Sequence, residues 1–211
     1  MEPREVTVAA NRRVGPDTVA LDVKTPDGFS AEPGQFVKLT LDVEGESVSR
    51  FYTLSSPSVT DTFELTVGID PEGDVAPHIE ALEAGDTVTI AGPFGNDYYE
   101  GEARVVILAG GPGVGPAIGI AERALEDGGE AGIVYLDDAP VHEARLAALE
   151  EQGAAVFILD AGESMTDAVA SVLTGDEQLF IYGFADFLDA ATDALQAAGA
   201  DPETAKVENF G

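Results

Sequence analysis

The sequence predicts a β barrel plus an α/β domain: a six-stranded antiparallel barrel, then a doubly wound parallel sheet with helices. Short segments rich in Val, Thr and Leu, separated by Gly, Pro and Asp, fill the first half of the chain. From Arg104 onward, near-continuous apolar runs alternate with helical segments. No flexible linker separates the halves. We therefore expect two closely packed domains, residues 1–100 and 101–211.

Six strands are expected in the first domain, because each segment has the β-branched and apolar composition that suits a pleated sheet. In chain order they are VTVAA, TVALDV, GQFVKLTLDV, VSRFYTLSS, FELTVGI and DTVTI. A helical insert is expected near APHIEALEA, between the last two strands. Many short strands with turn residues between them are typical of a closed antiparallel barrel.

Parallel strands buried on both faces are expected in the second domain, because these runs are apolar throughout instead of alternating. They are RVVILAGG, AGIVYLDD, AAVFILDA and QLFIYGF. The accompanying helical segments are PAIGIAERALEDG, VHEARLAALEEQG and FLDAATDALQAAG, and the last two end in glycine, a usual helix stop. This alternation predicts a doubly wound fold with a nucleotide-binding topology.

Composition excludes several classes of protein. No apolar run approaches the ~20 residues that span a bilayer, and the start, MEPREVTV, lacks the layout of a secretory signal. We expect a cytoplasmic protein without membrane insertion. The absence of cysteine excludes disulfides, cysteine-bound clusters and thiolate catalysis. The two histidines, His78 and His142, form no ligand-spaced cluster, so no metal site is predicted.

The net charge is the least usual property of the chain. Forty acidic residues against ten Lys and Arg give a formal charge of −30, which disfavours nucleic acid and anionic membranes as partners. Self-repulsion of this size is tolerable in dense salt, where the Debye length falls to ~3 Å at 1 M. We therefore expect a halophilic protein; a merely acidic mesophilic one is the alternative.

A glycine-rich turn opens the second domain, in the sequence ILAGGPGVGPAIG. Gly111, Gly113 and Gly115 permit tight turns and close approach by a ligand, and the following helix offers its N-terminus to a phosphate. The turn is neither a Walker loop nor a regular G-x-G-x-x-G, since Ile118 occupies the last glycine position. By itself the motif is also compatible with a glycine turn that binds no ligand.

An arginine opens the strand segment RFYTLSSP, residues 50–57, in a chain where bases are rare. This segment is the first of three motifs along the chain. In order they are Arg-x-Tyr-Ser/Thr-x-x-Ser, Gly-Pro-x-Gly and Gly-Gly-x-Gly-x-x-Pro. The chain resembles the ferredoxin–NADP reductase superfamily in this order, and in a Glu-x-Phe near its end. The residues that carry the resemblance are Arg50, Tyr52, Thr53, Ser56, Gly92, Pro93, Phe94, Gly95, Gly110, Gly111, Gly113, Pro116, Glu208 and Phe210.

The resemblance implies a flavin held by the barrel. Arg50 would neutralise the pyrophosphate through charge-assisted hydrogen bonds, and Tyr52 would lie against the isoalloxazine ring. Arg50 and Tyr52 alternate along a strand and so share a face, and Phe51 belongs to the same cofactor-binding segment. Thr53 would hydrogen-bond the reactive edge of the flavin. An ion pair with one of the many acids is the alternative for Arg50.

The two ends of the second domain complete the implied site. Glu208 would be a polar or proton-handling group, catalytic together with Thr53, and Phe210 would cover the flavin. Gly183 and Phe184 follow Tyr182 where the superfamily commonly has Cys-Gly-Pro. That substitution affects the geometry around a nicotinamide, and it leaves the reaction class unchanged because the cofactors carry the chemistry.

A second departure lies in GDVAPHIEAL, residues 73–82. Relatives have Gly-x-x-Ser at the start of a helix that caps the flavin pyrophosphate, and here Ala76 replaces the serine. Gly73 and the backbone N–H groups of Val75 and Ala76 remain to bind the phosphate. The loss of one hydroxyl contact keeps FMN open as an alternative to FAD.

The nicotinamide donor is predicted from the end of the strand IVYLDD, where nucleotide folds meet the adenine-side ribose. NADPH-using relatives often place an arginine a few residues after the strand's tyrosine, and the corresponding position here is Asp138, next to Asp137. A carboxylate accepts hydrogen bonds from a free ribose hydroxyl and repels a phosphate. We therefore favour NADH over NADPH, although Arg145 on the next helix is close enough in sequence to swing across.

Three functions follow from these observations. The first is a flavin-dependent NAD(P)H oxidoreductase that passes hydride to FAD and then electrons to an acceptor that the sequence does not identify. The second is a flavin-binding electron-transfer subunit that works only with a partner protein. The third is a nucleotide-binding module without catalysis, which requires the changes at Ala76 and Tyr182 to be disabling.

Overall fold

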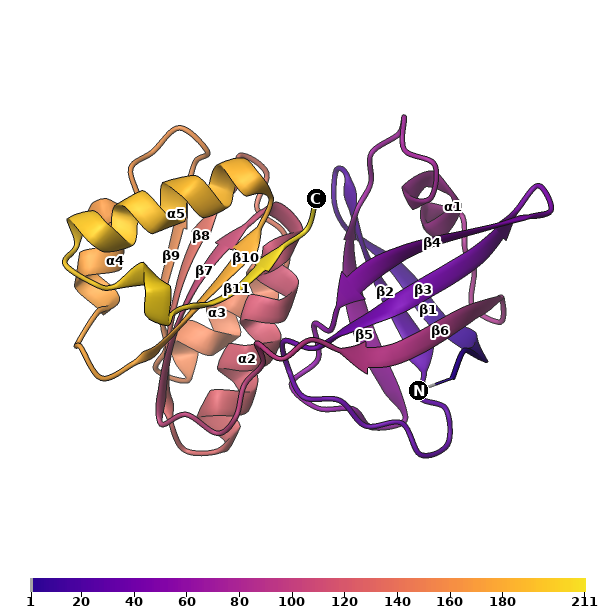
Figure 1. Cartoon of the computed structure of the whole chain (residues 1–211), viewed down its shortest axis with the longest axis horizontal. Helices are drawn as coiled ribbons and strands as arrows, with labels where there is room; N and C mark the ends of the chain where they lie inside the picture. The colour runs from indigo at the N-terminus through magenta and orange to yellow at the C-terminus, as the bar shows by residue number, and fades with distance from the viewer. Residues whose placement is uncertain (1) are drawn as a thin grey trace.

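The computed structural model describes residues 2–211 and shows two lobes side by side, a barrel and a layered α/β domain (Figure 1). The barrel sheet has the strand order β4-β3-β6-β1-β2-β5. Its strands are β1 (Arg4–Gly15), β2 (Thr18–Lys24), β3 (Phe36–Val43), β4 (Glu46–Thr53), β5 (Thr62–Gly68) and β6 (Thr87–Phe94). All neighbouring pairs are antiparallel. The predicted six-stranded antiparallel architecture is confirmed.

Alternation of side chains builds the barrel core. In β3, Val37, Leu39 and Leu41 are buried, and the residues between them face outward, as a sheet with one solvated face requires. A bridge between Leu54 and Leu65 joins the end of β4 to β5 and closes the two edge strands at that point. The expected helical insert is the single turn α1 (Ala76–Glu80), whose Ile79 is fully buried.

The second lobe has a parallel sheet in the order β11-β10-β7-β8-β9. Its strands are β7 (Arg104–Gly110), β8 (Glu130–Leu136), β9 (Ala155–Leu159), β10 (Gln178–Gly183) and β11 (Lys206–Asn209). The helices are α2 (Val114–Glu126), α3 (Glu143–Glu151), α4 (Thr166–Val172) and α5 (Ala185–Ala197). One apolar core lies under α2 and α3 and another under α4 and α5. The doubly wound fold is therefore confirmed.

Two elements of this lobe are additions to the sequence prediction. Helix α4 has seven residues and only small apolar side chains on its buried face, Ala168, Val169 and Val172. Strand β11 has four residues, of which only Val207 is apolar, unlike the other parallel strands. Both elements depend on packing that a local pattern does not encode. In residues 2–211, no helix combines the length and apolar character needed to cross a membrane.

The lobes pack directly on one another along α2. A Cβ atom on Gly115 would lie 2.3 Å from Ser55 Oγ, and one on Gly119 would lie 3.0 Å from the Ser55 carbonyl carbon. These two glycines, four residues apart, share one face of the helix. That face lets the helix backbone approach the end of the barrel more closely than any side chain would allow.

Candidate functional site

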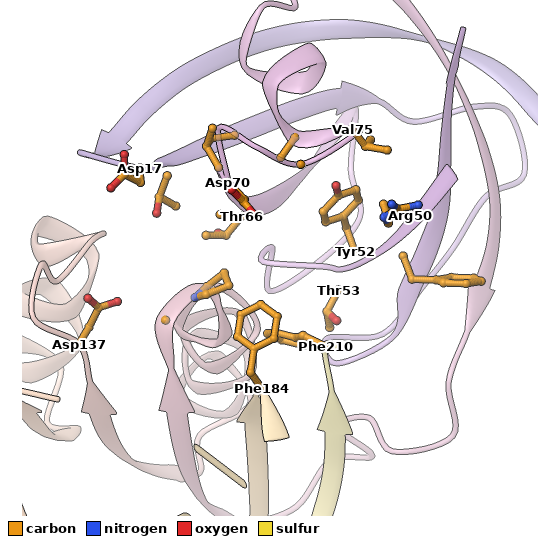
Figure 2. A pocket seen from close by; sticks show the side chains of 18 of the residues that line it. Asp17, Arg50, Tyr52, Thr53, Thr66, Asp70, Val75, Asp137, Phe184 and Phe210 are labelled. Carbon is orange, nitrogen blue, oxygen red and sulfur yellow. The ribbon is translucent and has the colours of Figure 1, made fainter. Parts of the chain in front are cut away.

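A cavity of about 590 Å³ lies between the barrel and the α/β lobe, within the range of small-molecule and cofactor sites. Figure 2 shows Arg50 and Tyr52 on its barrel side, and Phe184 and Phe210 near the ends of β10 and β11. Among the residues expected from the sequence, the lining contains Arg50, Phe51, Tyr52, Thr53, Gly73, Val75, Ala76, Gly111, Pro116, Phe184 and Phe210. Segments distant in sequence thus meet here.

Strand β4 positions the barrel wall of the cavity. Arg50 pairs with Leu39 and Tyr52 pairs with Val37 on β3, so both side chains lie on the face of the sheet that those buried residues share. Burial raises the pKa of the Tyr52 hydroxyl to about 12, while the charge of Arg50 acts in the opposite direction. The hydroxyl is therefore neutral at physiological pH.

Among residues 2–211, Arg50 is the one cation in the cavity lining. It is 54% exposed, donates to the Ser49 carbonyl at 2.9 Å, and lies 3.8 Å from Asp74. Asp74 itself is 84% exposed, and a pair of this kind contributes little to stability. The remaining N–H donors of Arg50 are available to an anion in the cavity.

Thr53 and Glu208 meet at the junction of the two lobes. Thr53, buried at the end of β4, donates from Oγ1 to Glu208 Oε1 at 3.2 Å. The pKa of the Glu208 carboxyl is raised to about 7, mainly by burial and also by the charge of Asp97, while the hydrogen bond from Thr53 acts in the opposite direction. A carboxyl group with this pKa exchanges a proton near neutral pH.

Aromatic side chains form the mouth of the cavity. Phe184 and Phe210 lie edge to face with ring centroids 5.9 Å apart, a favourable geometry for an aromatic pair. Phe184 is 52% exposed and Phe51, on the opposite lobe, is 60% exposed. Large apolar side chains that stay exposed at a cavity mouth indicate a ligand or partner surface.

Four aspartates line the cavity together, and the sequence did not indicate that they form one group. Asp17, Asp70 and Asp74 come from the barrel, and Asp137 follows β8 on the other lobe. In a chain with forty acidic residues, no pattern separates these carboxylates from the others. Thr18 and Thr66 also line the cavity and belong to strands recognised only as barrel elements.

The two consecutive aspartates after β8 lie in different surroundings. Asp137 lines the cavity, accepts from the Ala139 N–H at 2.8 Å, and accepts from the Tyr135 hydroxyl at 2.9 Å. Asp138, the predicted residue, lies outside the lining and accepts from the Ala161 N–H at 2.9 Å. Of the two, Asp137 is the one that lines the cavity, because neighbouring side chains point in different directions; the binding of a ribose at this position stays a prediction.

The glycine turn has a different physical basis from the one expected. Gly111 lines the cavity with φ of +55°, a backbone conformation that favours glycine. Gly113 and Gly115 are buried outside the lining, and a Cβ on Gly113 would lie 2.2 Å from the Tyr182 carbonyl oxygen. The last two glycines therefore make room for protein atoms.

Tyr182 and Gly183 are also placed away from the cavity lining. The Tyr182 ring is buried, and its hydroxyl donates to the Asp97 carbonyl at 3.1 Å, in the segment that joins the lobes. A Cβ on Gly183 would lie 2.6 Å from a ring atom of Phe187. Tyr182 thus anchors the segment between the lobes and lies outside the cavity lining, and its role beside a nicotinamide stays a prediction.

Comparisons with known proteins agree with this geometry. The family described as the oxidoreductase FAD-binding domain matches residues 5–99. A ferredoxin NADP+ reductase from Neisseria gonorrhoeae, solved with bound FAD and NADP, superposes with a TM-score of 0.81 at 18% identity, over all of both chains. The flavohem-like FAD/NAD-binding domain of a Vibrio cholerae nitric oxide dioxygenase gives a TM-score of 0.84 at 21% identity, over 99% of this chain and 98% of that one.

The chain thus has the ferredoxin–NADP reductase-like fold, and the resemblance seen in the sequence is confirmed. The glycine betaine monooxygenase reductase subunit of Chromohalobacter salexigens is 43% identical over 94 residues, 42% of this chain and 25% of that protein. NADH-cytochrome b5 reductase 1 of Laccaria bicolor is 29% identical over 130 residues, 59% of this chain. The matches span less than half of these relatives.

Proposed function

We propose that the protein is a flavin-dependent NAD(P)H oxidoreductase. In this proposal residues 1–100 hold FAD, residues 101–211 bind the nicotinamide nucleotide, and electrons leave to an acceptor. The observation that supports it most is the cavity itself, which is lined both by the barrel that matches the FAD-binding family and by the α/β lobe. Thr53 belongs to its lining and donates to Glu208, which lies just outside the lining.

The residues of the barrel wall fit a flavin nucleotide. Arg50 offers a partly free guanidinium to a pyrophosphate, and Tyr52 offers an apolar ring beside it. Gly73, Val75 and Ala76 line the cavity near Arg50 and offer backbone to the phosphates. When bound, the flavin would supply the capacity to accept a hydride and release electrons singly or in pairs. FMN stays the alternative, because the departure at Ala76 removes a hydroxyl.

The Thr53–Glu208 pair would handle the proton that accompanies electron transfer. Thr53, which lines the cavity, holds one carboxylate oxygen of Glu208 in place. A carboxyl with a pKa of about 7 both gives up and takes back a proton at little cost near neutral pH. Phe210, two residues on, would cover the bound ring together with Phe184.

On the α/β side, Gly111, Pro116 and Asp137 would bind the nicotinamide nucleotide. We favour NADH, because Asp137 presents a carboxylate to a ribose and would repel a 2′-phosphate. Arg145 does not swing across: it donates to Glu64 at 2.7 Å and to both carboxylate oxygens of Glu122. No cation of residues 2–211 other than Arg50 lines the cavity.

The acceptor would be a protein in the second form of this proposal, an electron-transfer subunit. The names of two relatives support it: the reductase subunit of glycine betaine monooxygenase, and the electron transfer component of a toluate 1,2-dioxygenase of Pseudomonas putida, 30% identical over 130 residues. The exposed Phe51 and Phe184 at the cavity mouth leave an apolar surface for docking. A cytoplasmic location follows from this proposal, because NADH is made and used inside cells.

Anaerobic titration tests the proposed function. Purified protein reconstituted with FAD should lose its visible flavin absorbance on addition of NADH. Turnover of a soluble dye by the protein alone would favour the stand-alone enzyme, and bleaching without turnover would favour the subunit. A protein that binds neither FAD nor FMN would contradict both forms of the proposal. The remaining function would then be the third one, a nucleotide-binding module without catalysis.

A further inference from the structure

The turn that leads into α3 touches the barrel next to the cavity. His142, immediately before α3, has Nε2 2.9 Å from Oγ1 of Thr66 on β5, and both side chains are buried. Thr66 Oγ1 is also 2.8 Å from Ser55 Oγ, which accepts the Thr66 N–H at 3.0 Å. Thr66 itself lines the cavity. A buried polar chain therefore runs from the barrel wall to the other lobe.

A second contact reinforces the first, one helical turn further on. Arg145 donates to Glu64 Oε1 at 2.7 Å and to the Ser55 carbonyl at 2.8 Å. Glu64 and Thr66 are two residues apart on β5 and therefore point to the same side of the sheet. The start of α3 is thus held on one strand by two adjacent polar contacts, the first buried and the second partly buried.

The same turn carries part of the cavity lining. Residues 137–142 connect β8 to α3, with Asp137 and Ala139 in the lining and His142 at the far end. Val141 packs against the end of β1, where a Cβ on Gly15 would lie 2.3 Å from Val141 Cγ1. His142 has φ of +57°, uncommon for a residue with a side chain. Strain of this kind persists only where surrounding contacts hold it.

We propose that His142 is a positioning residue for the nicotinamide nucleotide. Its hydrogen bond to Thr66 fixes residues 137–142 against β5 and thereby sets the distance between Asp137 and the barrel wall. This inference rests on the proposed function, since Asp137 is there assigned to the nucleotide. His142 touches neither ligand: it acts through the turn that it anchors.

The test compares two substitutions at the same position in the FAD-loaded protein. His142→Gln keeps an amide nitrogen where Nε2 lies, and His142→Leu keeps the volume without the hydrogen bond. We expect His142→Leu to raise the KM for NADH roughly fivefold to tenfold, the effect of losing one buried hydrogen bond. The dissociation constant for FAD should change less than about twofold, and His142→Gln should restore the KM.

Hydrogen exchange supplies a readout that does not depend on turnover. In protein with FAD and no nucleotide, the amides of residues 137–142 should exchange faster in His142→Leu than in wild type, while β3 amides keep their rates. Thr66→Val removes the same bond from the barrel side and serves if His142→Leu does not fold. For the double variant His142→Leu, Thr66→Val, the increase in KM expressed as a free energy should be smaller than the sum of the increases for the two single variants.

Two outcomes would overturn the inference. An unchanged KM with faster global unfolding would reduce His142 to a purely structural residue, and equal KM values for the Leu and Gln variants would remove the hydrogen bond from the explanation. Wild-type protein whose flavin is reduced by neither NADH nor NADPH would instead contradict the proposed function, and with it the role assigned to His142.

Discussion

The hydroxyl of Thr53 donates a hydrogen bond of 3.2 Å to Glu208 across 155 positions of the chain. Thr53 ends a barrel strand and Glu208 lies on β11, the edge strand of the parallel sheet. Neither lobe alone contains the pair, so the site forms only when both lobes fold and pack. Anything that shifts the lobes relative to each other should therefore act on the Glu208 carboxyl.

Replacing Glu208 by Gln should make the protein more stable above neutral pH. The carboxyl has a pKa of about 7 in the folded state against an ordinary value of 4.5, so the folded state holds the proton more tightly than the unfolded state. The associated stability is fully present below pH 4.5 and is lost as the pH rises through 7. Glu208→Gln avoids that loss and should gain on the order of 1 kcal/mol above pH 7, after allowance for partial solvent access.

Urea unfolding of wild type and Glu208→Gln across this pH range measures the difference. Glu126→Gln, on the exposed side of α2, removes the same charge from another site and is the matched control. If both substitutions stabilise the protein equally, the effect comes from the net charge of the chain and not from the environment of Glu208.

Arg50→Ala should weaken flavin binding and leave the barrel folded. Loss of a hydrogen bond to a charged group costs roughly 1.5–3 kcal/mol, and the guanidinium makes only one 2.9 Å bond and one 3.8 Å ion pair within the protein. Lys38→Ala is the control, because Lys38 is an exposed cation on the neighbouring strand outside the cavity lining. Titration of FAD into each variant decides; equal affinities for FAD would remove the pyrophosphate role from Arg50.

His142 should make the wild-type protein sensitive to acid. Burial, followed by the charges of Arg145 and Arg12, lowers the pKa of its imidazole from 6.5 to about 4, while Glu122 acts in the opposite direction. The unfolded state then binds the extra proton between these values, so stability falls as the pH falls from 6.5 toward 4. His142→Gln should reduce the loss of stability over this pH range by about 1–3 kcal/mol. Thermal unfolding of wild type and variant at several pH values measures it, and equal slopes of stability against pH in the two proteins would contradict it.

The fold and the β4 wall of the cavity could be predicted from the sequence because their signals are local. Alternation along β3 and uninterrupted apolar runs in β7 and β8 each fix an element within a few residues. Arg50 and Tyr52 share a face for the same reason, since strand register determines direction. The four-residue strand β11 has no such signal, because its pairing with β10 supplies its stability.

The contacts between the lobes could not be predicted. The bond between Thr66 and His142, and the ion pair of Arg145 with Glu64, join residues 76 and 81 positions apart. In a sequence with forty acidic residues, nothing marks Glu64 as the partner of Arg145. Gly113 and Gly115 show the same limit: the sequence requires small residues there, but only packing shows that Tyr182 and Ser55 occupy the space.

Low salt should unfold the protein, if its acidity is an adaptation to dense salt. The formal charge of −30 produces self-repulsion that is screened over ~3 Å at 1 M salt but over ~30 Å at 0.01 M. Circular dichroism after dialysis from molar to millimolar potassium chloride should show loss of strand and helix signal. Equal spectra and equal melting temperatures in both buffers would mean that the charge has another purpose.

The choice of donor is the sharpest test of the α/β side of the cavity. Asp137 lines the cavity and is oriented by the Tyr135 hydroxyl, whereas Asp138 faces the Ala161 amide outside it. Wild-type protein should therefore use NADH with a kcat/KM roughly tenfold or more above that for NADPH, because a carboxylate beside the ribose repels a 2′-phosphate.

Asp137→Arg should reverse or erase this preference by placing a cation where the phosphate would lie. Asp138→Arg makes the same change of charge one residue away, on a side chain that does not line the cavity, and should keep the preference for NADH. Steady-state kinetics with both donors on the three proteins compares the positions directly. If Asp138→Arg alone shifted the preference toward NADPH, the ribose position would return to Asp138, and Asp137 would be left as the residue that caps the turn at Ala139.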